Sequence, residues 1–226
     1  MSTKAEYRCE ASSVEGFIQH LAVSYVGRGY VFYVTGVIPD RKDPREIDRK
    51  IIAQYGISAS KFTRARRKRA GLPNAHYLRH ERFFVILSTV GNQAFFSGEG
   101  EAVRDARKTP IQYEGYAVGF YSGKPSVRIN EGTYLNLKAY FEDIATKRKA
   151  ETIATQVFNL PFRPYGAIVK QVRAILKRVN EIRQSAGFEP VPKTAVRLWR
   201  KPVKTFEGGG ETVDSQTEST LRTSSP

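Results

Sequence analysis

Residues 30–38 read Tyr30-Val31-Phe32-Tyr33-Val34-Thr35-Gly36-Val37-Ile38, a run dense in β-branched and aromatic side chains. A run of this kind predicts a strand that is buried on both faces of a sheet. A second apolar run, Phe83-Phe84-Val85-Ile86-Leu87, predicts another buried strand within 82–89. Because about 40 mostly helical residues separate the two runs, the pattern favours parallel pairing through a crossover connection.

Three helices are predicted around the first of these strands. One begins after Ser12 or Ser13, since Ser12 and Glu15 fit a capping box. The next begins at Asp43-Pro44, where an acid suits the N-cap and proline the first helical position, and Gly56 caps its end. The third follows the short link 56–58 and runs to Ala70.

Beyond residue 109 the pattern changes twice. Alternating residues over 110–121 predict a strand, and Ser122-Gly123-Lys124-Pro125 is a turn that leads into a returning strand at 126–129. We expect this hairpin on the same sheet as the earlier strands. Apolar stripes at helical spacing then mark helices within 134–144 and 153–158 and a long helix over about 165–186.

The sequence therefore predicts an α+β fold with a small mixed β-sheet, flanking helices, a helical C-terminal half and a disordered acidic tail. The sheet is expected from the strands near 30–38, 82–89, 110–121 and 126–129. Three regions are predicted: an α/β core with a basic helix pair (1–130), a helical region with a basic C-terminal segment (131–206), and the tail (207–226).

Composition excludes several classes of protein. Hydrophobic residues make up 40% of the 226 residues, enough for an ordinary core. The run Gly29–Pro39 is far shorter than the roughly 20 residues of a membrane-spanning helix. The single cysteine, Cys9, excludes a disulfide framework and a cysteine-based zinc site. These features predict a cytoplasmic protein without a membrane span.

Charge is the strongest signal. Lys and Arg total 37 against 22 acids, a net charge of +15. The tail holds four acids and one base, so residues 1–206 carry +18. A surplus of this size usually matches an anionic partner, with nucleic acid as the first expectation and an anionic membrane surface as the second.

The third helix concentrates this charge. Its six cations are Lys61, Arg64, Arg66, Arg67, Lys68 and Arg69, and no acid occurs between Lys61 and Leu78. At about 100° per residue the cations surround the helix, so only Phe62 and Ala65 remain to seat it on the body. Burying unpaired charges costs several kcal/mol each, so we expect this helix to project from the body. It is then either a nucleic-acid contact or a solvated face.

Residues 51–62, Ile-Ile-Ala-Gln-Tyr-Gly-Ile-Ser-Ala-Ser-Lys-Phe, resemble a helix-turn-helix: a helix, a short glycine-containing turn and a basic helix. The resemblance covers about 25 residues and implies that the second helix enters the major groove of DNA. It would place Ser58, Ser60, Lys61 and Arg64 at base edges and Arg66, Arg67, Lys68 and Arg69 at phosphates. The alternative is a pair of helices that simply cross over a sheet in an α/β unit.

Two further basic surfaces lie near the C-terminus. The long helix carries Lys170, Arg173, Lys177, Arg178 and Arg183 opposite its apolar stripe, an arrangement that favours an ordinary solvated face. Segment 193–204 interleaves cations with the only tryptophan, and its candidate contacts are Arg197, Trp199, Arg200 and Lys201. Cations can follow phosphates while the ring stacks on an unpaired base. Trp199 is equally suited to anchoring this segment on the body.

Evidence for catalysis is thin. Glu99, Glu101 and Asp105 are the catalytic candidates, because clustered carboxylates could hold Mg²⁺ for phosphodiester hydrolysis. Arg104 and Arg107 are near enough to neutralise them, which favours an acid–base surface loop. On a strand, His76 and His80 would be about 13 Å apart, too far to share a metal ion.

The resulting expectation is a nucleic-acid-binding protein that contacts duplex DNA through residues 58–69, with DNA favoured over RNA. The alternatives are a metal-dependent nuclease or a strand-transfer or replication enzyme of a mobile element, and a structural RNA-binding protein. An enzyme is not favoured. No metal and no small-molecule cofactor is expected, apart from Mg²⁺ in a nuclease, and a DNA-binding role would make the protein nucleoid-associated. The sequence indicates neither an oligomeric state nor a target site.

Overall fold

A computed structural model describes residues 7–206, apart from the side chains of Lys61 and Gln93; the predicted acidic tail lies outside these residues. The first sheet has the strand order β1-β3-β4-β2-β5. Its strands are β1 (Glu10–Ala11), β2 (Phe32–Val37), β3 (Ala75–His80), β4 (Phe83–Ser88) and β5 (Arg104–Asp105). Strand β1 is parallel to β3, and all other neighbours are antiparallel, so the sheet is mixed.

A second, antiparallel sheet consists of β6 (Ile111–Tyr113), β7 (Tyr116–Tyr121) and β8 (Lys124–Ile129). Tight turns join its strands. Glu114 and Gly115 both have positive φ, 45° and 76°, between β6 and β7. Ser122 and Gly123, with φ of 50° and 73°, make the turn between β7 and β8.

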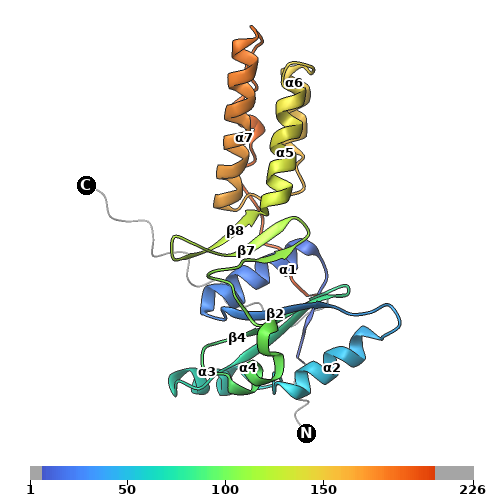
Figure 1. The fold of residues 1–226 in the computed structure, drawn as a ribbon, viewed down its shortest axis with the longest axis vertical. Coiled ribbons are helices and arrows are strands. Elements are labelled where there is room, and N and C mark those ends of the chain that lie inside the picture. The colour runs from blue at the N-terminus through green and yellow to red at the C-terminus, as the bar shows by residue number, and fades with distance from the viewer. Residues whose placement is uncertain (1–6, 207–226) are drawn as a thin grey trace, which may run out of the picture.

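Helix α1 (Val14–His20) lies between the two sheets (Figure 1). The side chain of Ser13 caps it by accepting a 3.1 Å hydrogen bond from the amide of Gly16, which confirms a start after Ser13. The predicted capping box of Ser12 and Glu15 is wrong, because the Ser12 hydroxyl donates to the carbonyl of Thr205 instead. A π-helical turn, η1 (Leu21–Tyr25), and a 3₁₀ turn, η2 (Val26–Arg28), continue it to Gly29, where φ is 94°.

The opposite face of the first sheet carries α2 (Pro44–Gln54), α3 (Lys61–Arg69), α4 (Gln93–Glu99) and the 3₁₀ turn η3 (Gly100–Ala102). Asp43 caps α2 through the amide of Arg45, at 3.0 Å, and Pro44 is its first residue, as predicted. Gly56, with φ of 58°, follows the end of α2.

The C-terminal half is helical, as predicted. It comprises α5 (Glu131–Ile144), α6 (Ala150–Phe158), α7 (Gly166–Ser185) and the 3₁₀ turn η4 (Lys193–Ala195). Helices α5 and α7 extend away from the second sheet as a projecting bundle (Figure 1). The side-chain amide of Gln171 ties α7 to β8, since it both donates to and accepts from the backbone of Ile129, at 3.0 and 2.9 Å.

The last described residues return to the first helix, α1, and contact it. Residues 203–206, here called the strap, run along α1: the amide of Ser12 donates a 2.9 Å hydrogen bond to the Thr205 carbonyl, and the side-chain amide of Gln19 both donates to the carbonyl of Val203 and accepts from its N–H. A Cβ atom on Gly16 would lie 3.0 Å from the Cα of Thr205. Glycine at position 16 therefore permits the close approach of the strap.

Two apolar cores result from this layering. The larger one includes Phe17, Leu78 and Val85 and continues through the second sheet to Ile168 and Val179 of α7. The smaller one joins the other face of the first sheet, including Val34, Ile86 and Tyr77, to Ile57 and Phe95. Successive residues of β4 alternate between the two cores, which is the period expected of a strand buried on both faces.

The predicted parallel pairing of 30–38 with 82–89 is wrong. Strand β2 pairs antiparallel with β4, because β3 precedes β4 in a hairpin whose turn contains Glu81 at a φ of 51°. The sequence pattern missed β3 because His76, Arg79 and His80 interrupt its apolar run. All three are nonetheless buried, since each finds a polar partner.

The expected single strand over 110–121 is also wrong, and its placement on the first sheet is wrong. The Glu114–Gly115 turn divides it into β6 and β7, which form the separate sheet with β8. The predicted turn after Tyr121 is confirmed. The α+β class, the mixed sheet and the flanking helices are confirmed. Within residues 7–206, no helix is long and apolar enough to cross a membrane.

Candidate nucleic-acid interface

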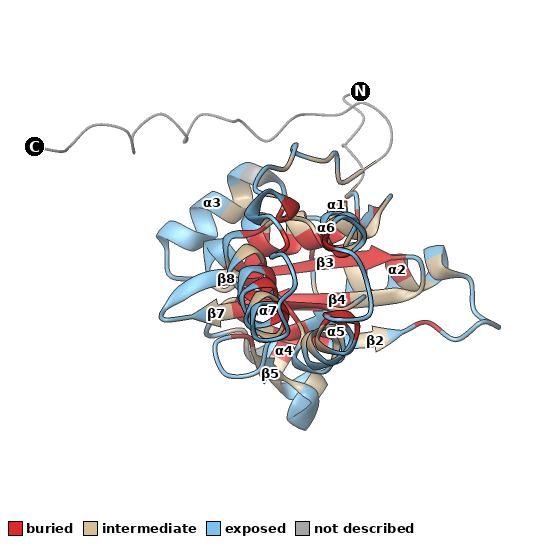
Figure 2. Cartoon of the chain, turned by 90° about the horizontal axis from the view of Figure 1, so that it is seen from above, coloured by how far each residue is buried: buried red, intermediate tan, exposed pale blue. Residues whose placement is uncertain are grey.

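Helix α3 is exposed along almost its whole length (Figure 2). The hydroxyl of Ser60 caps it by accepting from the amide of Thr63 at 3.1 Å. At the other end, Leu72 donates its amide to the Arg67 carbonyl at 2.8 Å across Gly71, whose φ is 68°. Local hydrogen bonds thus define both ends of a helix that contributes none of its described side chains to either core.

Helix α3 is held to the body by Arg64, and the expected seating by Phe62 and Ala65 is wrong. Both of those side chains are exposed, and Phe62 is 86% exposed. Arg64 is half-buried: its guanidinium donates to the Ala59 carbonyl, and its own carbonyl accepts from the side chain of Asn74 at 3.3 Å. Arg64 is therefore turned toward the body, away from the position that the helix-turn-helix resemblance implied.

The remaining cations of α3 are free of acids. Among the described side chains, none of Arg66, Arg67, Lys68 and Arg69 has a carboxylate within ion-pair distance. The basic surface of α7 differs, because Lys177 and Arg178 pair with Glu181 and Glu142 at 3.4–3.9 Å. Within residues 7–206, no acid therefore compensates the positive charge of these four side chains.

The basic face of α7 is also smaller than predicted. Arg183 is buried, with hydrogen bonds to the carbonyls of Ala145, Arg148 and Glu189 at 2.5, 2.8 and 2.6 Å. It holds together the far end of the bundle and presents no charge to a partner. The exposed cations of α7 are Lys170, Arg173, Lys177 and Arg178.

A hollow of about 760 Å³ lies beside α3. Its lining combines the link before the helix with one helix face, and consists of Gly56, Ser58, Ala59, Ser60, Thr63, Arg66, Arg67, Ala70 and Leu72. Two guanidinium groups and several hydroxyls therefore share one concave surface. Such a surface suits a phosphate group, because arginine binds phosphate with two parallel hydrogen bonds.

The geometry of a helix-turn-helix is absent. Helices α2 and α3 follow one another to opposite ends of the same sheet face, whereas the two helices of that motif pack against each other (Figures 1 and 2). Tyr55, the residue that follows α2, instead contacts α4, where its ring meets that of Phe95 with ring centres 5.9 Å apart. The alternative, two helices that cross over a sheet, describes the connection from β2 to β3.

Segment 193–204 places its candidate contacts differently. Arg197 donates to the carbonyls of Leu160 and Phe162, and Arg200 stacks on the ring of Tyr165 at 4.3 Å, so both hold this segment to the bundle. Trp199 is 71% exposed, and the ammonium of Lys201 lies 5.8 Å from its ring. Trp199 is therefore not the anchor that the sequence allowed, and it is open to a ligand.

Sequence reasoning missed a cluster of buried rings near Arg64. His76 stacks on Tyr25 with ring centres 4.4 Å apart, meets Tyr30 edge-on at 4.6 Å, and bonds the hydroxyl of Tyr7 at 3.2 Å. Burial, with the nearby charge of Arg64, lowers the pKa of His76 to about 3. Burial raises the pKa of Tyr7 to about 12, opposite to the shift that a tyrosine nucleophile needs.

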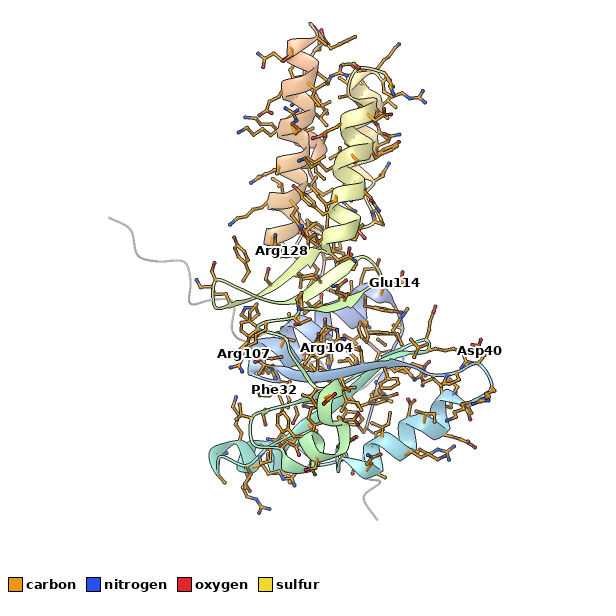
Figure 3. The ribbon with its side chains drawn as sticks, viewed as in Figure 1. Phe32, Asp40, Arg104, Arg107, Glu114 and Arg128 are labelled. Atoms are coloured by element: carbon orange, nitrogen blue, oxygen red, sulfur yellow. The ribbon has the colours of Figure 1, made fainter. Side chains whose placement is uncertain are left out.

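The acidic candidates do not converge. Glu99 accepts a hydrogen bond from the hydroxyl of Tyr55, and Glu101 is exposed. Asp105 forms a 2.7 Å ion pair with Arg107, and the guanidinium of Arg107 lowers the pKa of Asp105. The guanidinium of Arg107 also lies 5.5 Å from the ring centre of Phe32. The two residues are labelled next to one another in Figure 3. Within residues 7–206 no group of three His, Cys, Asp or Glu side chains is placed to hold a metal ion.

The two histidines of β3 are likewise separate. His80 forms a 2.8 Å hydrogen bond with the hydroxyl of Tyr113 and so links the two sheets, while His76 belongs to the ring cluster.

No protein-family model, curated protein or solved structure matches this chain.

Proposed function

We propose that the protein binds nucleic acid and that α3 supplies the main contact with the phosphates. The observation that carries the proposal is the set of exposed cations Arg66, Arg67, Lys68 and Arg69, which have no acid partner among the described residues. An uncompensated cluster of this kind releases counterions when it meets a polyanion, and that release drives binding.

The hollow beside α3 adds a second support. Arg66 and Arg67 line it together with Ser58 and Ser60, so a phosphate there would meet two charges and hydrogen-bond donors at once. Trp199 and Lys201 supply a secondary contact in the proposal. Arg197 and Arg200 have structural partners and are left out of it.

The test is fluorescence anisotropy with labelled oligonucleotides across a salt series. In one variant, Arg66, Arg67, Lys68 and Arg69 are all changed to glutamine. In its matched control the four exposed cations of α7, Lys170, Arg173, Lys177 and Arg178, are changed in the same way. Both variants lose four charges, so a difference between them reports on position rather than on net charge.

We expect the α3 variant to bind weakly and to lose up to about 3.6 from the slope of log affinity against log salt on duplex DNA, because each lost phosphate contact contributes about 0.9. The α7 variant should keep most of the affinity and slope. Equal losses in the two variants, or no binding by the wild type at low salt, would contradict the proposal.

A further inference from the structure

Phe62 has no structural explanation in the fold. It is the most exposed large apolar side chain among the described residues, at 86%, and it belongs to neither core. Yet it stands on the helix that carries the free cations. At about 100° per residue, Phe62 is within roughly 40° of both Arg66 and Arg69 around the helix axis. An aromatic ring and two guanidinium groups thus occupy one face.

Arg66 links this face to the hollow. It lines the hollow together with Arg67 and with Leu72, which is also exposed. The helix therefore offers a flat ring, a cation beside it and a concave cationic surface in succession. Stacking rings and phosphate-binding cations at short intervals are what a polynucleotide strand with accessible base faces requires.

Resting on the proposed function, we propose that α3 binds an unpaired polynucleotide strand, with one base stacked on Phe62 and adjacent phosphates bound by Arg66 and Arg67. In a duplex the base faces already stack on one another, so a protruding phenylalanine gains little from simple phosphate binding along its backbone. An unpaired base gives the ring a partner and removes it from water.

An anionic membrane surface fits this helix less well. Helices that lie in a membrane interface separate a broad apolar face from a polar one. Helix α3 has one large apolar side chain, and its cations Arg66, Arg67, Lys68 and Arg69 surround the axis. Its charge distribution therefore favours a strand that passes along the helix over a flat lipid surface.

The experiment compares a 20-nucleotide single strand containing one 2-aminopurine with the same strand in a duplex, as DNA and as RNA. Phe62→Ala removes the ring, and Phe62→Tyr keeps it. The control Tyr121→Ala removes another exposed ring that an arginine covers, since the guanidinium of Arg128 lies 4.9 Å from Tyr121 on the second sheet. Alanine is favourable in an exposed helix, so the folding of Phe62→Ala is not at risk.

We expect Phe62→Ala to weaken single-strand binding between about 5-fold and 160-fold, the range for one lost base–aromatic stack, with an unchanged salt slope. Phe62→Tyr and Tyr121→Ala should bind like the wild type. Quenching of 2-aminopurine on binding should be lost in Phe62→Ala. The preferred sugar then assigns the strand as DNA or RNA.

Equal affinity for duplex and single strand, together with normal binding by Phe62→Ala, would overturn this inference while leaving phosphate binding by α3 intact. In that case only the variant without Arg66, Arg67, Lys68 and Arg69 would lose binding, and Phe62→Ala would not. Stronger binding to vesicles containing phosphatidylserine than to any oligonucleotide would overturn both the inference and the proposed function.

Discussion

Arg79 and Asp48 form a buried, two-pronged ion pair that fastens β3 to α2. The Nε atom of Arg79 lies 2.9 Å from one carboxylate oxygen of Asp48, and its Nη2 atom lies 3.0 Å from the other. The hydroxyl of Tyr77 also donates to Asp48, at 2.6 Å. Glu10, at 2.9 Å, is a second and more exposed partner of Arg79. A strand with a buried arginine therefore depends on an acid contributed by a crossover helix.

Asp48→Ala is expected to lower the free energy of unfolding by up to about 3–5 kcal/mol. It removes the buried carboxylate that pairs with Arg79 and accepts from Tyr77, and it leaves Arg79 only the more exposed Glu10 as an acid partner. Urea denaturation measures the change. The matched control is Asp40→Ala, since the side chain of Asp40 is 98% exposed and pairs with Arg82 at 3.1 Å. Asp40 is labelled at the edge of the molecule in Figure 3. That change should cost no more than about 1 kcal/mol. Similar losses in both variants would refute the assignment of Asp48 as a structural acid.

The ring cluster predicts a dependence of stability on pH. His76 has an ordinary pKa of 6.5 when unfolded and about 3 when folded, so the unfolded chain takes up a proton first and stability falls as the pH drops from 6.5 toward 3. Between about pH 7 and pH 5 the wild type should lose roughly 2 kcal/mol more than His76→Phe, which stacks but does not titrate. Parallel stability curves for the two proteins would show that His76 is not the group responsible.

Arg183 is predicted to stabilise the end of the bundle. Arg183→Met should lower the free energy of unfolding by about 2–5 kcal/mol, because the carbonyls of Ala145, Arg148 and Glu189 lose their donor. Arg178→Met removes an exposed arginine of the same helix and should cost no more than about 1 kcal/mol. Amide hydrogen exchange should speed up near residues 145–148 and 187–191 in the first variant only.

The fluorescence of Trp199 can report whether segment 193–204 contacts nucleic acid. It is the only tryptophan in the chain and is 71% exposed, so its emission should be that of a solvated indole and acrylamide should quench it readily. If segment 193–204 touches nucleic acid, a saturating oligonucleotide should change that emission and protect the ring from acrylamide. Unchanged emission at saturation, checked by anisotropy, would remove this segment from the interface.

The helix boundaries could be predicted from the sequence because their determinants are local. Asp43, Pro44 and Gly56 define α2 within its own length, and Ser13 caps α1 three residues ahead of its partner. Strand β3 could not be predicted, since the hydrogen-bond partners that allow its polar residues to be buried are distant in the sequence. Arg79 needs Asp48, 31 positions away, and His80 needs Tyr113, 33 positions away.

The candidate site divides in the same way. That α3 is cationic and projects from the body follows from its own residues, and the structure has this arrangement. Its orientation does not follow, because Arg64 is held by Ala59 and Asn74 on neighbouring segments, which turns Phe62 outward. Hydrophobicity alone assigned Phe62 to the interface with the body. In the structure, the hydrogen bonds of Arg64 place Arg64, and not Phe62, against the body.

The strap has a consequence for synthesis of the protein. Ser12 and Thr205 are hydrogen-bonded across 193 positions, so the surface of α1 beside Gly16 lacks this cover until residue 205 has left the ribosome. The first sheet has all its strands by residue 105, long before that contact can form. Closing so long a loop is a late and slow step. During translation, chaperones and proteases can therefore reach the side of α1 that the strap later covers.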